Sequence, residues 1–251
     1  MTNFENPSDG VKKRWLMEQP IFDRIKSQGF SEYAKDMNLK SACIRPEDAP
    51  IRVCCMDEGT PSFLHAAGGG ILLPPEELEK YLGHTKAQVL TSHDGCGAAR
   101  IYAGMHGIDM ARADETGLMW AKKTAEKHGL IHEHISASSM SRPEEGHFAR
   151  VCYYDLTGSF DWRRDEGLPA GFTVSHKFMD TDYALKAETL TALKIAFGEH
   201  GLGHLLDADH PFILCAVARE EDLARALSEL KSLPHHYDGR VEIEHITVPD
   251  F

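Results

Sequence analysis

Two short apolar segments, each ending in residues that can bind a metal, constrain the fold of this chain most. The first is Ile51-Arg52-Val53-Cys54-Cys55-Met56-Asp57, and the second is Val89-Leu90-Thr91-Ser92-His93-Asp94-Gly95-Cys96-Gly97. Such short apolar or β-branched segments, bounded by Gly, Pro or Asp, are typical of buried parallel strands. Open α/β sheets place their sites at the carboxyl ends of parallel strands. The sequence therefore predicts that Cys55, His93 and Cys96 meet at one point.

These three side chains form a chemically coherent ligand set. Two thiolates and one imidazole suit zinc, which prefers tetrahedral coordination by nitrogen and sulfur. Three protein ligands leave a fourth position for water, which is the arrangement of a catalytic rather than a structural site. Zinc lowers the pKa of bound water to about 7 and so supplies hydroxide at neutral pH. We therefore expect Cys55, His93 and Cys96 to be zinc ligands.

Cys54 is the alternative to Cys55 as a ligand. Adjacent residues of a strand face opposite sides, so only one of the two cysteines can point toward His93. Asp57 shares the face of Cys55 by the same alternation, which favours Cys55. His65 lies just before a glycine-rich segment, and we expect a solvated loop residue there rather than a base lining the site.

The order of these motifs resembles the β-class carbonic anhydrases. That family has Cys-x-Asp-x-Arg at one strand end, an Ala-Gly turn, and His-x-x-Cys-Gly at the next strand end. This chain has Cys55-Met56-Asp57-Glu58-Gly59, then Ala67-Gly68-Gly69, then His93-Asp94-Gly95-Cys96-Gly97. The resemblance covers residues 50–105 and extends weakly to Val151–Gly158. It implies that Asp57 is the catalytic residue that accepts a hydrogen bond from zinc-bound hydroxide.

The chain departs from the family pattern at Gly59, where the family has arginine. In the family this arginine keeps the aspartate off the metal. Without it, Asp57 is free to move onto zinc and close the site, unless another cation, such as Arg52 or Arg100, takes its place. Both outcomes are open from the sequence.

Three further residues are expected to line the pocket. Gly68 and Gly69 allow the backbone to approach the metal closely, since glycine has no side chain to obstruct it. They do not form a phosphate-binding loop, because the Gly-Lys-Ser/Thr ending is absent. Asp94 is the third candidate, with an N-cap of the following helix as its alternative role.

Composition excludes several classes of protein. The formal net charge is −12, which argues against nucleic-acid and anionic-membrane partners. No apolar run approaches the ~20 residues of a membrane span, and the amino terminus lacks an apolar signal core. The six cysteines are spread through the chain, which fits reduced thiols or metal ligands in a cytoplasmic protein.

Alternating strand and helix patterns predict an α/β fold: parallel core strands flanked by helices, like the β-carbonic anhydrase sheet, plus a carboxyl-terminal α/β extension. We expect a zinc domain with amino-terminal helices over residues 1–160 and the extension over 161–251. No internal sequence repeat is visible. The expected strands cover 51–55, 89–93, 131–135, 149–154, 172–176, 211–218 and 241–248, and the expected helices cover 10–38 (broken near Pro20 or Gly29), 74–82, 98–106, 114–128, 182–200 and 220–233.

The resulting hypothesis is a zinc-dependent lyase, a carbonic anhydrase-like enzyme in which hydroxide on the metal attacks carbon dioxide or a similar small electrophile. Two alternatives remain open: a hydrolase of carbonyl sulfide or carbon disulfide, and a non-catalytic zinc protein with a sensing or scaffold role. The resemblance also implies a homodimer or higher homo-oligomer. In the family the amino-terminal helices contact a partner subunit, whereas packing on their own domain is equally expected here.

Overall fold

The computed structural model has an α/β fold with two four-stranded parallel sheets, and it describes residues 9–143, 146–198, 201–233, 237 and 239–250. The predicted α/β class is confirmed. The strands are β1 (Arg52–Cys54), β2 (Leu64–His65), β3 (Val89–His93), β4 (Ile131–Ile135), β5 (Val151–Asp155), β6 (Gly171–Ser175), β7 (Phe212–Ala218) and β8 (Val241–Thr247). The α-helices are α1 (Asp9–Gln28), α2 (Phe30–Ala34), α3 (Leu39–Cys43), α4 (Pro75–Thr85), α5 (Gly97–Met105), α6 (Ala113–His128), α7 (Thr181–Tyr183), α8 (Leu190–Ala196) and α9 (Glu220–Lys231).

The two sheets repeat one topology. Their strand orders are β2-β1-β3-β4 and β6-β5-β7-β8, so the second order is the first with every strand number raised by four. A 3₁₀ turn follows the second strand of each set, η1 (Ala67–Gly69) after β2 and η5 (His176–Phe178) after β6. The sequence showed no repeat, because the shared property is the connectivity of the strands and not the identity of their residues.

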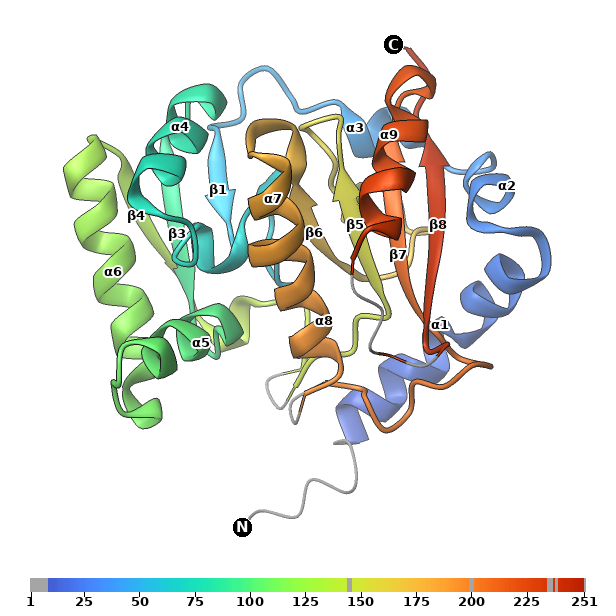
Figure 1. The fold of residues 1–251 in the computed structure, drawn as a ribbon, viewed down its shortest axis with the longest axis horizontal. Coiled ribbons are helices and arrows are strands. Elements are labelled where there is room, and N and C mark those ends of the chain that lie inside the picture. Colours follow the sequence, from blue (N-terminus) through green and yellow to red (C-terminus); the bar gives the residue numbers. More distant parts are fainter. Residues whose placement is uncertain (1–8, 144–145, 199–200, 234–236, 238, 251) are drawn as a thin grey trace.

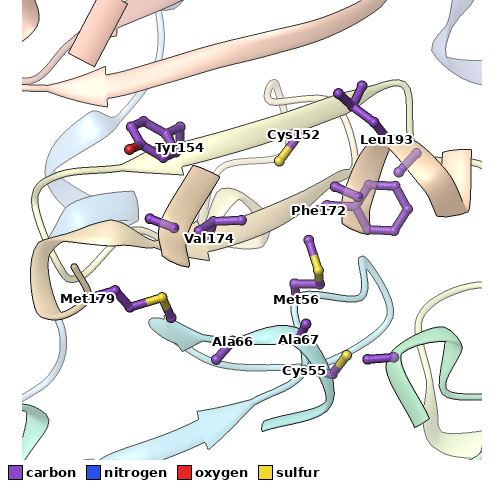
Figure 2. Close-up of a cluster of buried hydrophobic side chains, with 14 of the residues drawn as sticks. Cys55, Met56, Ala66, Ala67, Cys152, Tyr154, Phe172, Val174, Met179 and Leu193 are labelled. Atoms are coloured by element: carbon purple, nitrogen blue, oxygen red, sulfur yellow. The ribbon is translucent and has the colours of Figure 1, made fainter. Parts of the chain in front are cut away.

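The sheets lie side by side with their strands running in opposite directions (Figure 1), so their carboxyl edges lie on opposite sides of the molecule. β2 and β6 are the neighbouring edges, where the backbone N–H of His65 donates to Ser175 Oγ at 2.8 Å. One apolar cluster spans this junction (Figure 2). It contains Cys55, Met56, Ala66 and Ala67 from the first sheet and its loops, and Cys152, Tyr154, Phe172, Val174, Met179 and Leu193 from the second half. The two halves therefore share one core.

The second sheet is buried on both faces. In β5, Cys152 and Tyr154 belong to the shared core, whereas Val151 and Tyr153 belong to a second cluster on the opposite face. The alternation follows from the strand period of two residues. The amino-terminal helices supply the other side of that second cluster. These helices therefore pack on their own chain, which is one of the two arrangements that the sequence left open.

Helix α1 continues through Pro20 and ends at Gln28, so the predicted break falls at Gly29. Gly29 has a φ of 82°, a left-handed conformation that glycine adopts at low cost. A short helix, α3, lies between the amino-terminal helices and β1. Its side chains Ala42 and Cys43 are buried against the second sheet.

The expected helix over 182–200 is not uniform. Residues Ala184–Thr189 form a π-helical segment between α7 and α8, and α8 ends at Ala196. His200 lies outside the described residues. The π-helical segment carries Glu188, whose side chain is fully buried. Such segments are rare and occur frequently at functional sites, which directs attention to this carboxyl group.

The second sheet begins at Val151, within the segment expected to form the zinc domain. The division at residue 160 stays a prediction. In the part of the chain that the structure describes, no helix combines the length and apolarity that crossing a membrane requires.

Substitution of Leu90 tests the packing of the core around the first sheet. Its side chain is fully buried in β3, so Leu90→Ala should lower the free energy of unfolding by about 2–5 kcal/mol, because it removes apolar contacts and leaves a cavity. Leu16→Ala is the control, since Leu16 is 69% exposed; it should change stability by less than about 0.5 kcal/mol. Urea denaturation followed by circular dichroism measures both. Equal effects in the two variants would contradict this packing.

Candidate metal centre

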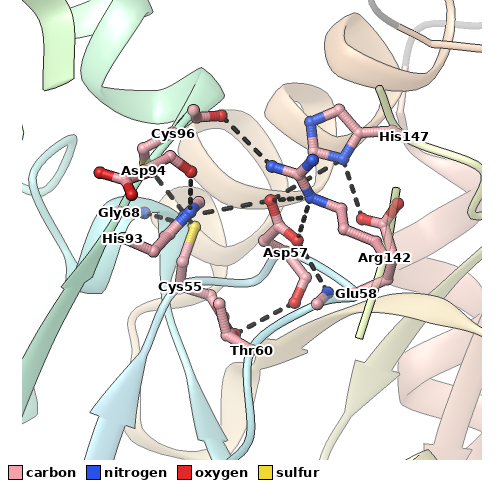
Figure 3. Close-up of polar contacts among 12 residues, drawn as sticks. Cys55, Asp57, Glu58, Thr60, Gly68, His93, Asp94, Cys96, Arg142 and His147 are labelled. Atoms are coloured by element: carbon pink, nitrogen blue, oxygen red, sulfur yellow. Dashed lines mark hydrogen bonds and ion pairs between the residues drawn. The ribbon is translucent and has the colours of Figure 1, made fainter. Parts of the chain in front are cut away.

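The structure brings together the three side chains that the sequence predicted as ligands. Cys55 follows β1, His93 ends β3, and Cys96 immediately precedes α5. Their ligand atoms all lie within 4.8 Å of one another, and all three residues are buried. Figure 3 shows the thiol of Cys55 beside the His93 ring. The chain therefore contains a group able to hold a metal ion at the carboxyl edge of the first sheet.

The orientation of His93 suits metal binding. Its Nδ1 lies 2.8 Å from the carbonyl oxygen of Asp94, so Nδ1 carries the proton that donates to this carbonyl. Nε2 is then the atom that a metal would bind once its proton has left, and it is buried without a hydrogen-bond partner among the described residues. Metal-bound histidines usually donate their other N–H in this way. A buried nitrogen without a partner beside two thiols fits a group that could hold a metal ion.

Protons must leave before a metal binds. Burial, reinforced by Cys96, raises the pKa of the Cys55 thiol well above its usual range. Burial lowers the pKa of His93, but Cys55 and Asp57 outweigh it and raise this pKa to about 9. A metal ion therefore displaces protons from the centre, and its apparent affinity rises with pH.

The backbone of Gly68 contacts the centre directly. Its N–H donates to Cys55 Sγ at 3.1 Å, which stabilises a thiolate. Gly68 has a φ of 56°, and a Cβ atom there would lie 2.7 Å from Ile71 Cγ2 and 3.5 Å from Cys96 Sγ. Glycine is needed for this approach. Gly69 packs against β3 instead: a Cβ atom there would lie 3.1 Å from both Leu90 Cδ1 and the carbonyl oxygen of Thr91.

Cys54 points away from the centre. Its thiol donates to the carbonyl of Pro61 at 3.3 Å, whereas Cys55 Sγ lies 4.0 Å from Cys96 Sγ. The alternation of the strand thus places Cys55 and not Cys54 in the group, as the sequence favoured.

A cation from a distant part of the chain, Arg142, pairs with Asp57. Its Nε donates to Asp57 Oδ1 at 2.9 Å and Oδ2 at 3.1 Å, and both side chains are buried. Gly59 makes this possible: a Cβ atom there would lie 2.9 Å from Arg142 Cγ and 2.8 Å from Met140 Cε. The candidate Arg52 instead pairs with Glu133 at 3.0 Å. Arg142 lies 85 positions from Asp57 along the chain, so no local motif revealed it.

Asp57 is held as a carboxylate beside the ligands. Its Oδ2 lies 4.0 Å from His93 Nε2 and 3.8 Å from His147 Nδ1. Burial raises the pKa of this carboxyl, but His147, His93 and Arg142 outweigh burial and hold the pKa well below its usual range. Its ion pair with Arg142 fixes the carboxylate in place.

Glu58 and His147 extend the charged network, and sequence reasoning missed both. His147 Nδ1 donates to Glu58 Oε2 at 2.9 Å, and the other carboxylate oxygen accepts the backbone N–H of Phe148 at 3.0 Å. These bonds tie the loop that carries Arg142 to the loop that carries Asp57. With Asp57 the two residues form a second compact acidic and histidine group, but their donors and acceptors are matched to each other.

Asp94 supports the site from outside. Its carboxylate accepts from His134 Nε2 at 3.1 Å and from the N–H of Ala137 at 3.0 Å, while its backbone carbonyl orients His93. It is not the cap of α5: Cys96 holds the N-cap position, and no side chain caps this helix. His65 is buried, 3% exposed, which corrects the expectation of a solvated residue. Both its ring nitrogens lie 2.7 Å from carbonyl oxygens, those of Cys55 and Ser62.

Glu188 supports the loop of the metal centre from the second half of the chain. One carboxylate oxygen accepts the backbone N–H of Ala67, next to Gly68. The other oxygen is buried without a partner among the described residues. Ile195 of α8 contacts the same region, since a Cβ atom on Gly97 would lie 2.9 Å from its Cδ1. The centre is thus built by both halves.

Comparisons of this chain with protein-family models, with curated proteins and with solved structures find no match.

Substitution of the ligands tests the centre. Cys55→Ser, His93→Ala and Cys96→Ser should each lower metal affinity by at least about 100-fold. Loss of a residue that only supports a ligand typically costs about 10- to 100-fold, so loss of a ligand should cost at least as much. Titration with zinc against a chromophoric chelator measures this affinity. Cys54→Ala is the matched control, because Cys54 is adjacent and fully buried but bonded to Pro61. If Cys54→Ala lost the metal and Cys55→Ser retained it, the assignment would be wrong.

The buried carboxyl group of Glu188 should make the free energy of unfolding depend on pH. Burial raises the pKa of its carboxyl from 4.5 to about 8. Between these values the folded state keeps a proton that the unfolded state has released, so the stability contribution present below pH 4.5 is lost as the pH rises to 8. Glu188→Gln should remove this loss, changing the stability difference from wild type by up to about 3–5 kcal/mol across the window. Denaturant midpoints at several pH values measure it. The control Glu79→Gln, at an exposed position of α4, should leave the slope unchanged.

Proposed function

We propose that this chain is a zinc-dependent, carbonic anhydrase-like enzyme that hydrates carbon dioxide or a similar small electrophile. Zinc is the proposed metal because two sulfurs and one imidazole nitrogen are the donors it prefers. Two sulfurs bound tetrahedrally at about 2.3 Å lie roughly 3.8 Å apart, and the two thiols here are 4.0 Å apart. The donor set therefore fits zinc with little rearrangement.

When bound, zinc supplies a hydroxide nucleophile at neutral pH by lowering the pKa of a water ligand to about 7. The residues of the chain then determine how that nucleophile is used. Asp57 Oδ2 faces the ligand His93 and, as a carboxylate, can only accept hydrogen bonds. Its proposed role is to accept one from the nucleophile and so fix the direction of attack.

The observation that carries the proposal is the ion pair of Arg142 with Asp57. An aspartate near a three-ligand metal centre is itself a potential fourth ligand, and it would close the site. The Arg142 guanidinium holds both carboxylate oxygens, and the N–H of Gly59 donates to Oδ1 at 2.7 Å. These donors keep the carboxylate beside the metal position and oppose its movement onto the metal.

The non-catalytic alternative was motivated by Gly59, and the contact with Arg142 weighs against it. Hydrolysis of carbonyl sulfide or carbon disulfide uses the same ligands and remains the alternative substrate class. The lyase activity, the cytoplasmic location and the homo-oligomeric state stay predictions. A small neutral substrate suits the setting, because all three ligand side chains are at most 4% exposed.

Stopped-flow carbon dioxide hydration on protein of known zinc content tests the proposal. Wild type should accelerate the reaction above buffer, and Asp57→Ala should reduce kcat/KM by about 100-fold or more, the scale of a lost proton-accepting group. Arg142→Ala should have a similar effect at unchanged zinc content. Arg52→Ala is the control, since Arg52 also pairs with a carboxylate through Nε, that of Glu133, but away from the centre.

Full zinc occupancy with no hydration of carbon dioxide and no hydrolysis of carbonyl sulfide or carbon disulfide would contradict the enzyme proposal. Equal losses in the Arg142 and Arg52 variants would contradict the specific role of Arg142.

A further inference from the structure

Two histidines share one face of the outermost strand of the first sheet. β4 has the sequence Ile131-His132-Glu133-His134-Ile135, and it is the last strand in the order β2-β1-β3-β4 (Figure 1). Residues two apart on a strand point to the same side, so His132 and His134 lie next to each other. His134 is exposed and His132 is half-exposed. Both residues therefore have contact with solvent.

The two rings converge on one atom, the hydroxyl oxygen of Ser92. Ser92 lies opposite His134 in the register of β3 and β4. Its Oγ is 2.9 Å from His134 Nδ1 and 3.0 Å from His132 Nε2. A hydroxyl group has one hydrogen, so it can donate to only one of these nitrogens. A divalent ion accepts the lone pairs of both. Because zinc binds imidazole nitrogen at about 2.0–2.1 Å, each ring would close by about 1 Å on an ion that took the place of the hydroxyl.

Asp94 prepares His134 for such a contact. His134 Nε2 lies 3.1 Å from Asp94 Oδ1, and a carboxylate only accepts hydrogen bonds, so Nε2 carries the proton. In the neutral ring, Nδ1 then presents its lone pair toward Ser92. The carboxylate is itself held, since its Oδ2 accepts the backbone N–H of Ala137 at 3.0 Å. Metal-binding histidines usually donate their second N–H to a carboxylate or carbonyl in this way. His134 therefore has the support that a metal ligand needs.

The charges around the pair allow a cation to bind. Partial burial, together with Lys122 and His134, lowers the pKa of His132 from its usual 6.5. The ring is therefore neutral at pH 7, and a neutral imidazole can carry its proton on either nitrogen. Lys122 opposes a cation, whereas the carboxylate of Asp94 favours one. Because the pair offers two imidazoles and no thiol, we expect weaker binding here than at the candidate metal centre.

We propose that His132 and His134 form a second metal site, which takes a divalent ion that prefers imidazole, such as zinc, nickel or copper, through His132 Nε2 and His134 Nδ1. Two protein ligands leave the other positions of the ion to water, so the bound metal exchanges readily. The site shares no ligand with the group formed by Cys55, His93 and Cys96. It is therefore independent of the proposed carbon dioxide chemistry.

Isothermal titration with zinc tests the proposal on the full chain, loaded beforehand with one equivalent of zinc. One further zinc ion should bind. His132→Gln and His134→Gln should each weaken this second binding by at least about tenfold, because loss of a residue that only supports a ligand already costs that much. His245→Gln is the matched control and should bind as wild type does. His245 is half-exposed on β8, the outermost strand of the second sheet, but the residues two positions away are Ile243 and Thr247.

The same titration on His93→Ala separates the two sites. This variant should lose the tight binding and keep the weaker one. If the candidate metal centre held no zinc at all, the weaker binding would still be measured on the chain without prior loading. Failure of the proposed enzyme function therefore leaves this test intact.

Imidazole nitrogen resonances of the wild type give a second readout, which decides the question even where a variant fails to fold. Zinc beyond one equivalent should shift His134 Nδ1 and His132 Nε2, while His134 Nε2 keeps its proton. The proposal is overturned if zinc-loaded wild type takes up no further ion, or if the second binding is unchanged in both His132→Gln and His134→Gln. Equal weakening in His245→Gln would also overturn it.

Discussion

The ion pair between Arg142 and Asp57 is the interaction on which the candidate metal centre depends. Both side chains are buried, and removal of one partner from a buried pair typically costs about 3–5 kcal/mol because it leaves an uncompensated charge. Arg142 reaches Asp57 only because Gly59 leaves room for its Cγ. Gly59 is therefore the residue that admits a cation from a distant loop.

The shared core explains why a centre on the first sheet needs the second half of the chain. The candidate ligands follow β1, end β3 and precede α5, but Glu188 accepts a hydrogen bond from the loop at Ala67, and Ile195 packs on Gly97. The ring of Phe172 on β6 lies 5.4 Å from that of His147. Separation of the halves would expose the apolar cluster between them and remove these supports. The centre is a property of the whole fold.

The sequence predicted what is local and periodic. Strand ends identified the three residues of the candidate metal group and the neighbouring Asp57, because the side-chain alternation and the carboxyl edge of a parallel sheet are encoded by neighbouring residues. The helix over 113–128 ends at Gly129 with a φ of 66°, as a glycine stop predicts. Partners from distant segments were invisible. Arg142 and Glu188 occur in stretches with no motif, and their roles follow only from how the two halves pack.

The topological repeat separates the role of the fold from that of the residues. Each half has a buried aspartate at the end of its first strand, Asp57 after β1 and Asp155 in β5. Both carboxylate oxygens of Asp155 accept hydrogen bonds from its own loop, from the N–H groups of Thr157, Gly158 and Phe160. Asp57 accepts one such N–H, from Gly59, and its Oδ2 remains directed at His93.

This difference follows from what surrounds each carboxylate. Because its own loop supplies hydrogen bonds to both oxygens of Asp155, this aspartate stabilises a turn. Asp57 takes most of its hydrogen bonds from Arg142 instead, and its Oδ2 still faces His93. The same strand order thus supports a candidate metal centre at the carboxyl edge of one sheet and a stabilised turn at that of the other, and the residues in the loops decide between them.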